Sequence, residues 1–144
     1  MDRLNLAKCV QHRVGKYLMG DATFADVEEW KELQQELAAG LKALNEWKGA
    51  TPDEEAERLL AILMGYCVAV RDSRCVERVL QQAEQVLPKV QDLVLKCYLA
   101  VFCYLECPDE ELGKVVSEEI MMLKESGRME EVGFLERLLE NIEA

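Results

Sequence analysis

The sequence is poor in the residues on which most enzymes and metal centres depend. It contains one histidine, His12, among 144 residues. Histidine titrates near neutral pH and is the commonest metal ligand, so this scarcity removes most general-base and metal-centred mechanisms. Cys9 lies three residues before His12 and could share its helix face, but no second pair is spaced to complete a four-ligand zinc site. His12 is therefore interpreted as a surface or structural residue.

Motifs for phosphate binding and nucleophilic catalysis are also missing. There is no glycine-rich phosphate loop and no G-x-S-x-G element. Carboxylates are abundant, but they cluster at expected helix starts and on polar faces, and none lies within an apolar run. Because acid–base catalysis needs one carboxyl group desolvated in a cleft, we expect no enzyme activity, no cofactor and no bound metal.

Long hydrophobic runs are absent as well. The two longest, residues 59–70 and 97–105, are well short of the roughly 20 residues that cross a bilayer. Charged and polar residues from Arg3 to Arg13 interrupt any signal-peptide core, so a cytoplasmic protein is expected. The six cysteines form no C-x-x-C pair, and most fall on expected apolar helix faces. They are interpreted as reduced, buried thiols.

Basic side chains are scarce relative to acidic ones. The chain has 17 Lys and Arg against 28 Asp and Glu, which gives a net charge of −11. This charge argues against direct binding to nucleic acid or to an anionic membrane, because their phosphates attract basic surfaces. The charge is also uneven, with a net of +2 over residues 1–21 and of −8 from Glu106 to the end. A basic protein partner is expected.

Helix-forming patterns are abundant, most clearly in residues 51–70. Thr51 can cap a helix by accepting from a free backbone N–H, and Glu54 can reach back to it. Pro52 suits the first turn, where its missing donor is not needed. The unbroken apolar run over residues 59–70 predicts a helix surrounded by other helices. The run over residues 97–105 predicts a second central helix packed beside it.

Apolar residues recur at intervals of three and four along the rest of the chain. They predict further helices over residues 4–19, from a Thr23 cap to about Trp47, and over residues 76–87, 89–106, 107–125 and 129–142. Gly40, inside the second of these, is expected where another backbone lies close. No segment alternates with period two. We therefore predict an all-α fold, a compact orthogonal or antiparallel bundle of about six to seven helices with two central apolar helices, in a single domain over residues 1–144.

Two of these helices begin with the same chemistry. The segment from Cys107 to Glu111 repeats the proline-and-acid pattern of residues 51–55. The echo indicates either duplicated helical hairpins or two helices that share one kind of start. The second interpretation is favoured, because no repeat signature of about 34 residues is present.

Some large side chains could contact a partner. Lys96 is flanked by apolar residues and is expected to extend to the surface or to pair with a carboxylate such as Asp109 or Glu110. Aromatic residues on helices lie more often in the core or at its edge than in interfaces. Core-edge positions are therefore favoured for Trp30, Trp47, Tyr66, Tyr98 and Tyr104.

Two blocks of the sequence resemble the UpxZ family from the capsular-polysaccharide loci of Bacteroides-type bacteria. The first is TPDEEAERLLAILMGYCVAVRD, residues 51–72, with its acid-rich helix start and the core Leu63-Met64-Gly65-Tyr66. The second is LVLKCYLAVFCYLECPDEELGKVVSEEI, residues 93–120. Together the blocks cover about a third of the chain.

The resemblance implies an antagonist of transcription antitermination. UpxZ-like proteins are understood to inhibit NusG-like antiterminators of the UpxY type encoded by other capsule loci, so that one polysaccharide is favoured at a time. No catalytic residues come with the family. The expected partner is a basic NusG-like protein, but the family assigns no contact to a particular residue. The net charge and the acid-rich segment after Glu106 suggest an acidic contact surface instead, with the candidate residues Lys96, Tyr104, Glu106, Asp109, Glu110 and Glu111. The alternative is a small acidic helical chaperone or adaptor of the secretion-chaperone type.

Overall fold

Seven α-helices and one short 3-10 turn make up the described part of the computed structural model, which comprises residues 2–18 and 27–143. No strand occurs in these two ranges, so the all-α prediction is confirmed for them. The predicted Thr23 cap lies outside the described residues. The helices are α1 (Arg3–Leu18), α2 (Val27–Asn45), α3 (Pro52–Gly65), α4 (Ser73–Val86), α5 (Leu93–Glu106), α6 (Glu110–Glu125) and α7 (Met129–Glu143), and the 3-10 turn η1 spans Leu87–Lys89.

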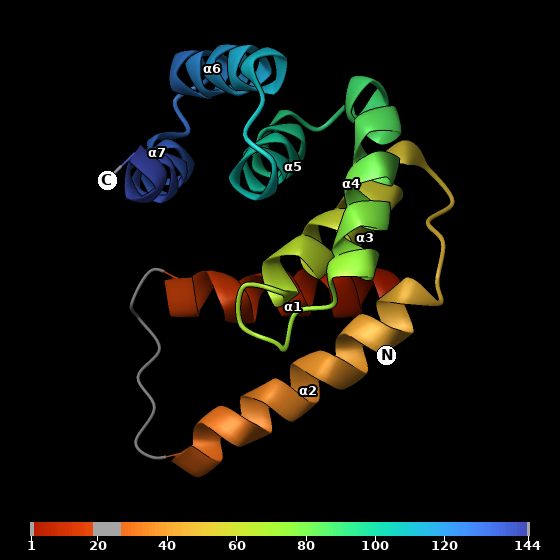
Figure 1. The fold of residues 1–144 in the computed structure, drawn as a ribbon. Coiled ribbons are helices and arrows are strands. Elements are labelled where there is room, and N and C mark those ends of the chain that lie inside the picture. The colour runs from red at the N-terminus through yellow and green to blue at the C-terminus, as the bar shows by residue number, and fades with distance from the viewer. Residues whose placement is uncertain (1, 19–26, 144) are drawn as a thin grey trace.

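Helix α3 is the centre of the molecule, as its apolar sequence predicted. It contacts α1, α2, α4 and α5. In Figure 1, α1 and α2 lie on one side of α3 and α4, and α5, α6 and α7 are grouped on the other. Every residue of α3 from Arg58 to Gly65 is buried, because helices surround it on all sides. Full burial of one such leucine contributes about 1.5–3 kcal/mol.

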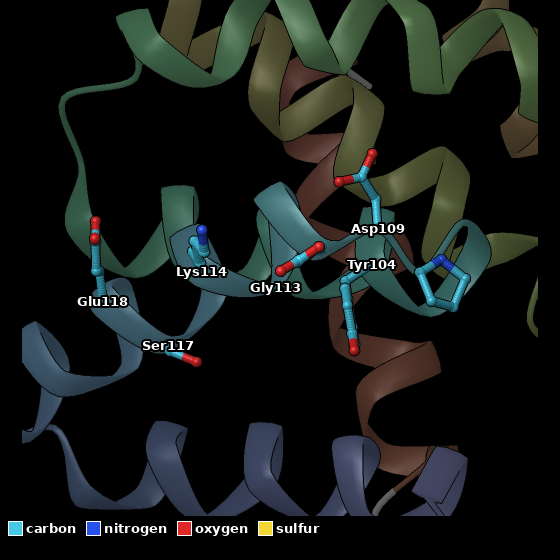
Figure 2. Close-up of a pocket in the computed structure, with 8 residues that line it drawn as sticks. Tyr104, Asp109, Gly113, Lys114, Ser117 and Glu118 are labelled. Atoms are coloured by element: carbon cyan, nitrogen blue, oxygen red, sulfur yellow. The ribbon is translucent and has the colours of Figure 1, made fainter.

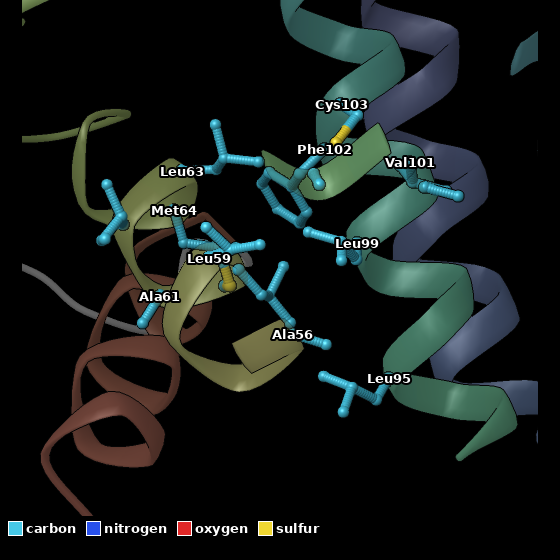
Figure 3. Close-up of a cluster of buried hydrophobic side chains, with 14 of the residues drawn as sticks. Ala56, Leu59, Ala61, Leu63, Met64, Leu95, Leu99, Val101, Phe102 and Cys103 are labelled. Atoms are coloured by element: carbon cyan, nitrogen blue, oxygen red, sulfur yellow. The ribbon is translucent and has the colours of Figure 1, made fainter. Parts of the chain in front are cut away.

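Helix α5 is the second central helix and joins α3 to the C-terminal pair α6 and α7. Figure 3 shows Leu59 and Leu63 of α3 facing Leu99 and Phe102 of α5. On another face of α5, the ring of Tyr98 stacks on Phe134 of α7 with centroids 5.8 Å apart. The predicted pairing of the two apolar helices is therefore confirmed.

The start of α3 has the predicted cap and an additional tie to α5. Thr51 Oγ1 accepts from Glu54 N at 3.1 Å, and Pro52 occupies the first turn. Glu55 Oε1 accepts from Gly49 N at 2.6 Å and so holds the loop that precedes the cap. Asp53 accepts from the backbone N–H groups of residues 91 and 92, at 2.8 and 3.1 Å. These bonds fix the beginning of α5 against the beginning of α3.

Both central helices are shorter than the bounds that the sequence predicted, although α5 contains its whole apolar run. Helix α3 ends at Gly65, and residues 66–69 form a turn stabilised by the bond from Ala69 N to Gly65 O at 2.8 Å. A Cβ at position 65 would lie 2.6 Å from Leu41 Cδ2, so α2 crosses α3 closely at its last residue. Helix α5 begins at Leu93 instead of residue 89, because Asp92 caps it by accepting from Leu95 N at 3.0 Å.

Two finer sequence expectations are corrected. A Cβ at Gly40 would meet the side chains of Val10 and Leu6 at 3.5 and 3.8 Å, so no backbone of another described element approaches that glycine closely. The sequence similarity between residues 51–55 and 107–111 does not give the two helices the same kind of start. Thr51 caps α3 and Pro52 lies inside the helix, whereas Asp109 caps α6 and the preceding proline lies outside it.

The apolar spacing of α7 predicts that it buries Val132, Leu135, Leu138, Leu139 and Ile142, and its packing is only partly as predicted. Val132 and Leu135 are buried together with Phe134, which the sequence analysis did not place in the core. Leu138 and Leu139 are half-buried at the core edge. The side chain of residue 142 lies outside the described part. The aromatic residues predicted at the core edge all pack there, namely Trp30, Trp47, Tyr66, Tyr98 and Tyr104.

Candidate partner-binding surface

An open hollow of about 630 Å³ lies where α5 ends and α6 begins. We call it the α6 hollow. Figure 2 shows that its side chains come from the end of α5, the connecting loop and the first half of α6. Gly113 brings α6 close to the half-buried Tyr104, since a Cβ there would lie 3.4 Å from the tyrosine ring. The residues that line the hollow are Tyr104, Pro108, Asp109, Glu110, Gly113, Lys114, Ser117 and Glu118.

Three of the six candidate residues meet at this hollow, and a fourth lies beside it. Tyr104, Asp109 and Glu110 line it, and Glu111 follows in the first turn of α6. Asp109 Oδ1 accepts from the backbone N–H groups of residues 111 and 112 at 2.7 and 3.3 Å, so its first role is to cap the helix. Glu110 and Glu111 are exposed at the positive end of the helix dipole, which favours their charge.

The other two candidates are engaged in intramolecular ion pairs. Glu106 binds Arg71 through both carboxylate oxygens, at 3.1 and 2.5 Å, and so holds the end of α5 to the loop between α3 and α4. Lys96 pairs at 3.4 Å with Glu119 of α6, not with Asp109 or Glu110 as predicted. Glu119 is buried, which corrects the expectation that the carboxylates lie only at helix starts and on polar faces.

The sequence contains one signal for the other residues that line the hollow, which were not predicted as candidates. Residues 110, 114 and 118 follow one another at intervals of four along α6, and residues 113 and 117 lie beside them. At that spacing, side chains share one helix face. This face is polar and includes a glycine, so it is not recognised when helix faces are identified by the spacing of apolar residues.

A second hollow, of about 480 Å³, lies between α2, the turn after α3, and α4. We call it the α2 groove. On its floor, Cys75 Sγ donates to Asn45 Oδ1 at 3.1 Å, and burial together with a hydrogen bond to Cys75 raises the pKa of Tyr66 to about 12. Gln34 Nε2 holds the turn by donating to Val68 O at 2.6 Å. Val70, on the rim, is 85% exposed. Lys42, Glu46, Asp72 and Arg78 give the groove balanced charges.

The cysteines are free, but the prediction that most are buried is wrong. Cys75, Cys97 and Cys103 are buried, whereas Cys9, Cys67 and Cys107 lie on a polar helix face, in a turn and at a helix end, where the core does not reach. Burial raises the pKa of the Cys97 and Cys103 thiols to about 12. Two effects raise the pKa of Cys67 to about 11 even though the residue is exposed. The larger is local desolvation and the smaller is the negative charge of the nearby Glu106 carboxylate. At neutral pH such thiols are poor nucleophiles.

In residues 2–18 and 27–143, no three His, Cys, Asp or Glu side chains gather closely enough to hold a metal ion. Of the helices in those ranges, none combines the length and apolar content that crossing a bilayer requires. The surface is thus described best by its hollows and its charge.

Comparison with known families decides what kind of protein this is. Residues 7–105 match the UpxZ family of transcription anti-terminator antagonists, and this segment is more than half of the chain. The chain belongs to the UpxZ family. Members of the UpxZ family are regulators, so this chain is a transcription anti-terminator antagonist. The resemblance noted in the sequence is confirmed.

The fold agrees with a known UpxZ structure. It resembles the crystal structure of a transcription anti-terminator antagonist UpxZ from Bacteroides uniformis ATCC 8492 with a TM-score of 0.79 and 24% identity, over 98% of this chain and 94% of that one. This likeness shows a shared fold. No curated protein matches the chain significantly. The UpxZ family match contains the whole α2 groove, whereas the α6 hollow lies beyond it apart from Tyr104.

Proposed function

We propose that this UpxZ-family protein binds a basic NusG-like antiterminator of the UpxY type and thereby limits expression of a capsular polysaccharide locus. The family match supports an antagonist of antitermination. The observation that supports a contact surface is the row of exposed acids from the beginning to the middle of α6. There, Glu110, Glu111 and Glu118 have no ion-pair partner among the described residues.

Unpaired surface carboxylates make this region attractive to a basic protein. They are part of the net charge of −8 from Glu106 to the end of the chain, so an approaching basic surface is steered toward α6 and α7. Charges already held in ion pairs attract a partner less. On this argument Glu110 and Glu111 contact the antiterminator, Tyr104 supplies an aromatic contact, and Asp109 holds the helix start. Lys96 and Glu106 keep α5 and α6 in place.

The test is a binding measurement between this protein and purified NusG-like antiterminators from capsule loci. Charge reversal in the double variant E110K/E111K is expected to weaken binding by about tenfold or more, which corresponds to about 1.4 kcal/mol. Binding of the wild-type protein should also weaken as salt rises from about 0.05 to about 0.5 M, because exposed charges are screened. Isothermal titration calorimetry measures both effects.

The matched control is E28K/E32K, a double reversal on α2 that changes the net charge by the same amount at another exposed site. It should lower affinity much less than E110K/E111K does. Equal losses for the two variants would assign the effect to overall charge and remove the α6 surface from the proposal. If wild-type protein bound none of these antiterminators and left their antitermination unchanged in a transcription assay, the proposed target would be wrong.

A further inference from the structure

The largest exposed apolar side chains of the C-terminal half are methionines. Met121, Met122 and Met129 are 62%, 49% and 60% exposed. Methionines on soluble proteins are normally buried, as Met64 is at 2% exposure. Exposed apolar side chains that gather in one place commonly mark an interaction site.

A tight turn brings these methionines to one end of the α6–α7 pair. Ser126 Oγ binds Met122 O at 2.9 Å, and Arg128 N donates to Leu123 O at 3.1 Å. Gly127, between them, has φ of +80°, the left-handed conformation that ends many helices. Because the backbone of residue 128 bonds to that of residue 123, Met129 begins α7 beside the last turns of α6. We call residues 121, 122 and 129 the methionine patch.

Unpaired acids surround the methionine patch. Glu118 and Glu125 lie one turn before and one turn after Met121 and Met122 on α6, and Glu130 follows Met129. All three are exposed and have no ion-pair partner among the described residues. The two bases nearest the patch in sequence are already paired within the protein, as Lys124 binds Glu136 at 2.8 Å and Arg128 binds Glu131 at 3.8 Å. The patch is therefore apolar at its centre and anionic at its margin.

Through Met121, the methionine patch continues the exposed face of the α6 hollow. Gly113, Ser117 and Met121 follow one another at intervals of four and so share one face of α6. From Glu110 to Met121 this face extends about 16 Å at the helical rise of about 1.5 Å per residue. Tyr104 and Pro108 lie at its other end. A partner helix of about three turns spans this distance.

We propose that the exposed face of α6, from the α6 hollow to the methionine patch, binds a basic amphipathic helix of the antiterminator. This inference rests on the proposed function and names the part of the partner that binds. Flexible methionine side chains adapt to the apolar side of such a helix, and the surrounding carboxylates pair with its lysines and arginines. A second copy of this chain fits less well, because its basic helix α1 buries its apolar residues Ala7, Val10 and Val14 within its own core.

Methionine methyl groups provide a direct readout. Protein labelled with ¹³C at the methionine methyl groups is titrated with two probes and followed by NMR. One probe is the purified NusG-like antiterminator. The other is a synthetic peptide of about 18 residues, long enough to be helical, with leucines along one face and lysines elsewhere. We expect the signals of Met121, Met122 and Met129 to shift with both probes, while that of buried Met64 does not. A peptide with glutamate in place of each lysine should shift none of them.

Two variants locate the contact. The triple variant M121S/M122S/M129S should weaken antiterminator binding by about tenfold, with an unchanged helical spectrum because all three side chains are exposed. The control variant V70S removes an even more exposed apolar side chain at the α2 groove and should leave affinity unchanged. Loss of binding in V70S but not in the triple variant would place the contact in the α2 groove and overturn the inference.

The outcomes separate this inference from the function on which it rests. If the antiterminator binds but the three methyl signals do not shift, the methionine patch is not the contact and the proposed function stands. If the antiterminator does not bind the wild-type protein, the proposed function fails. The titration with the lysine peptide then tests by itself whether the patch binds a basic amphipathic helix. No methyl shift with that peptide would also overturn the inference.

Discussion

The ion pair between Lys96 and Glu119 is asymmetric. Its nitrogen and oxygen are 3.4 Å apart, and the lysine side chain is 28% exposed whereas the glutamate side chain is 9% exposed. Glu119 Oε2 has no hydrogen-bond partner among the described residues. Without the glutamate, the lysine can extend into water. Without the lysine, a buried carboxylate has no compensation, which is the costlier situation.

We therefore predict unequal costs for the two halves of this pair. K96M should lower the free energy of unfolding by about 2 kcal/mol or more, and E119Q by about 1 kcal/mol or less. Urea denaturation at neutral pH measures both. The double variant K96M/E119L should recover most of the loss, because it leaves no buried charge. A larger loss for E119Q than for K96M would contradict this account.

Residue-scale sequence analysis identified Lys96 as unusual but named the wrong partner. Glu119 shares a helix face with Val116, Ile120 and Leu123, all buried. A search for acids inside continuous apolar runs misses it, because apolar residues on a helix recur at intervals of three and four instead of in sequence. The signal was present in the spacing. Which acid of α6 meets Lys96, however, depends on how α5 and α6 pack.

At the scale of single elements, two helical glycines have opposite surroundings. A Cβ at Gly40 of α2 would contact Val10 Cγ2 at 3.5 Å, an ordinary van der Waals distance. A Cβ at Gly65 of α3 would lie 2.6 Å from Leu41 Cδ2 and 3.2 Å from Leu41 Cγ. The first position has room for a methyl group. The second does not, because α2 packs directly on the end of α3.

The same substitution should therefore change stability in opposite directions. G40A is expected to raise the free energy of unfolding by up to about 1 kcal/mol, the difference in helix propensity between glycine and alanine. G65A should lower it by about 1–3 kcal/mol through overpacking. Thermal or urea unfolding of the two single variants tests this. In an L41A background G65A should cost less, and an undiminished cost there would show that the clash with Leu41 is not the cause.

At the scale of the whole molecule, several buried acids have raised pKa values. Burial raises the pKa of the Cys97 and Cys103 thiols from 9 to about 12, and that of the Tyr98 phenol from 10 to about 12. These groups are neutral when protonated. The folded protein therefore retains their protons at pH values where the unfolded chain has released them.

Stability should consequently fall in alkaline solution. Below about pH 9 these groups are protonated in both states and add no pH dependence, whereas between about pH 9 and 12 each one favours the unfolded chain. Urea midpoints should thus be lower at about pH 10 than at about pH 8. The variant C97A/C103A should show a shallower decline, since two of the groups are gone. A midpoint that did not change over this range would contradict the prediction.

The sequence by itself determined the helical class, the two central helices and the family. These properties depend on local chemistry, namely caps such as Thr51, apolar spacing, and the two blocks that resemble UpxZ proteins. Charge composition likewise pointed to a protein partner without reference to any fold. The sequence did not predict that α3 ends at Gly65, because the apolar run continues beyond that residue. In the structure, Leu41 of α2 packs against α3 at the residue where the helix ends.

Tertiary structure alone decided which part of the acidic surface is open to a partner. Glu106 and Lys96 looked equivalent to Glu110 and Tyr104 in sequence, but their ion pairs join elements that lie far apart along the chain. The α6 hollow exists because α5 and α6 meet at Gly113, and the methionine patch is exposed because no other described element covers it. The exposure of a side chain depends on neighbours that are distant in sequence, and the local sequence pattern does not show which residues those neighbours are.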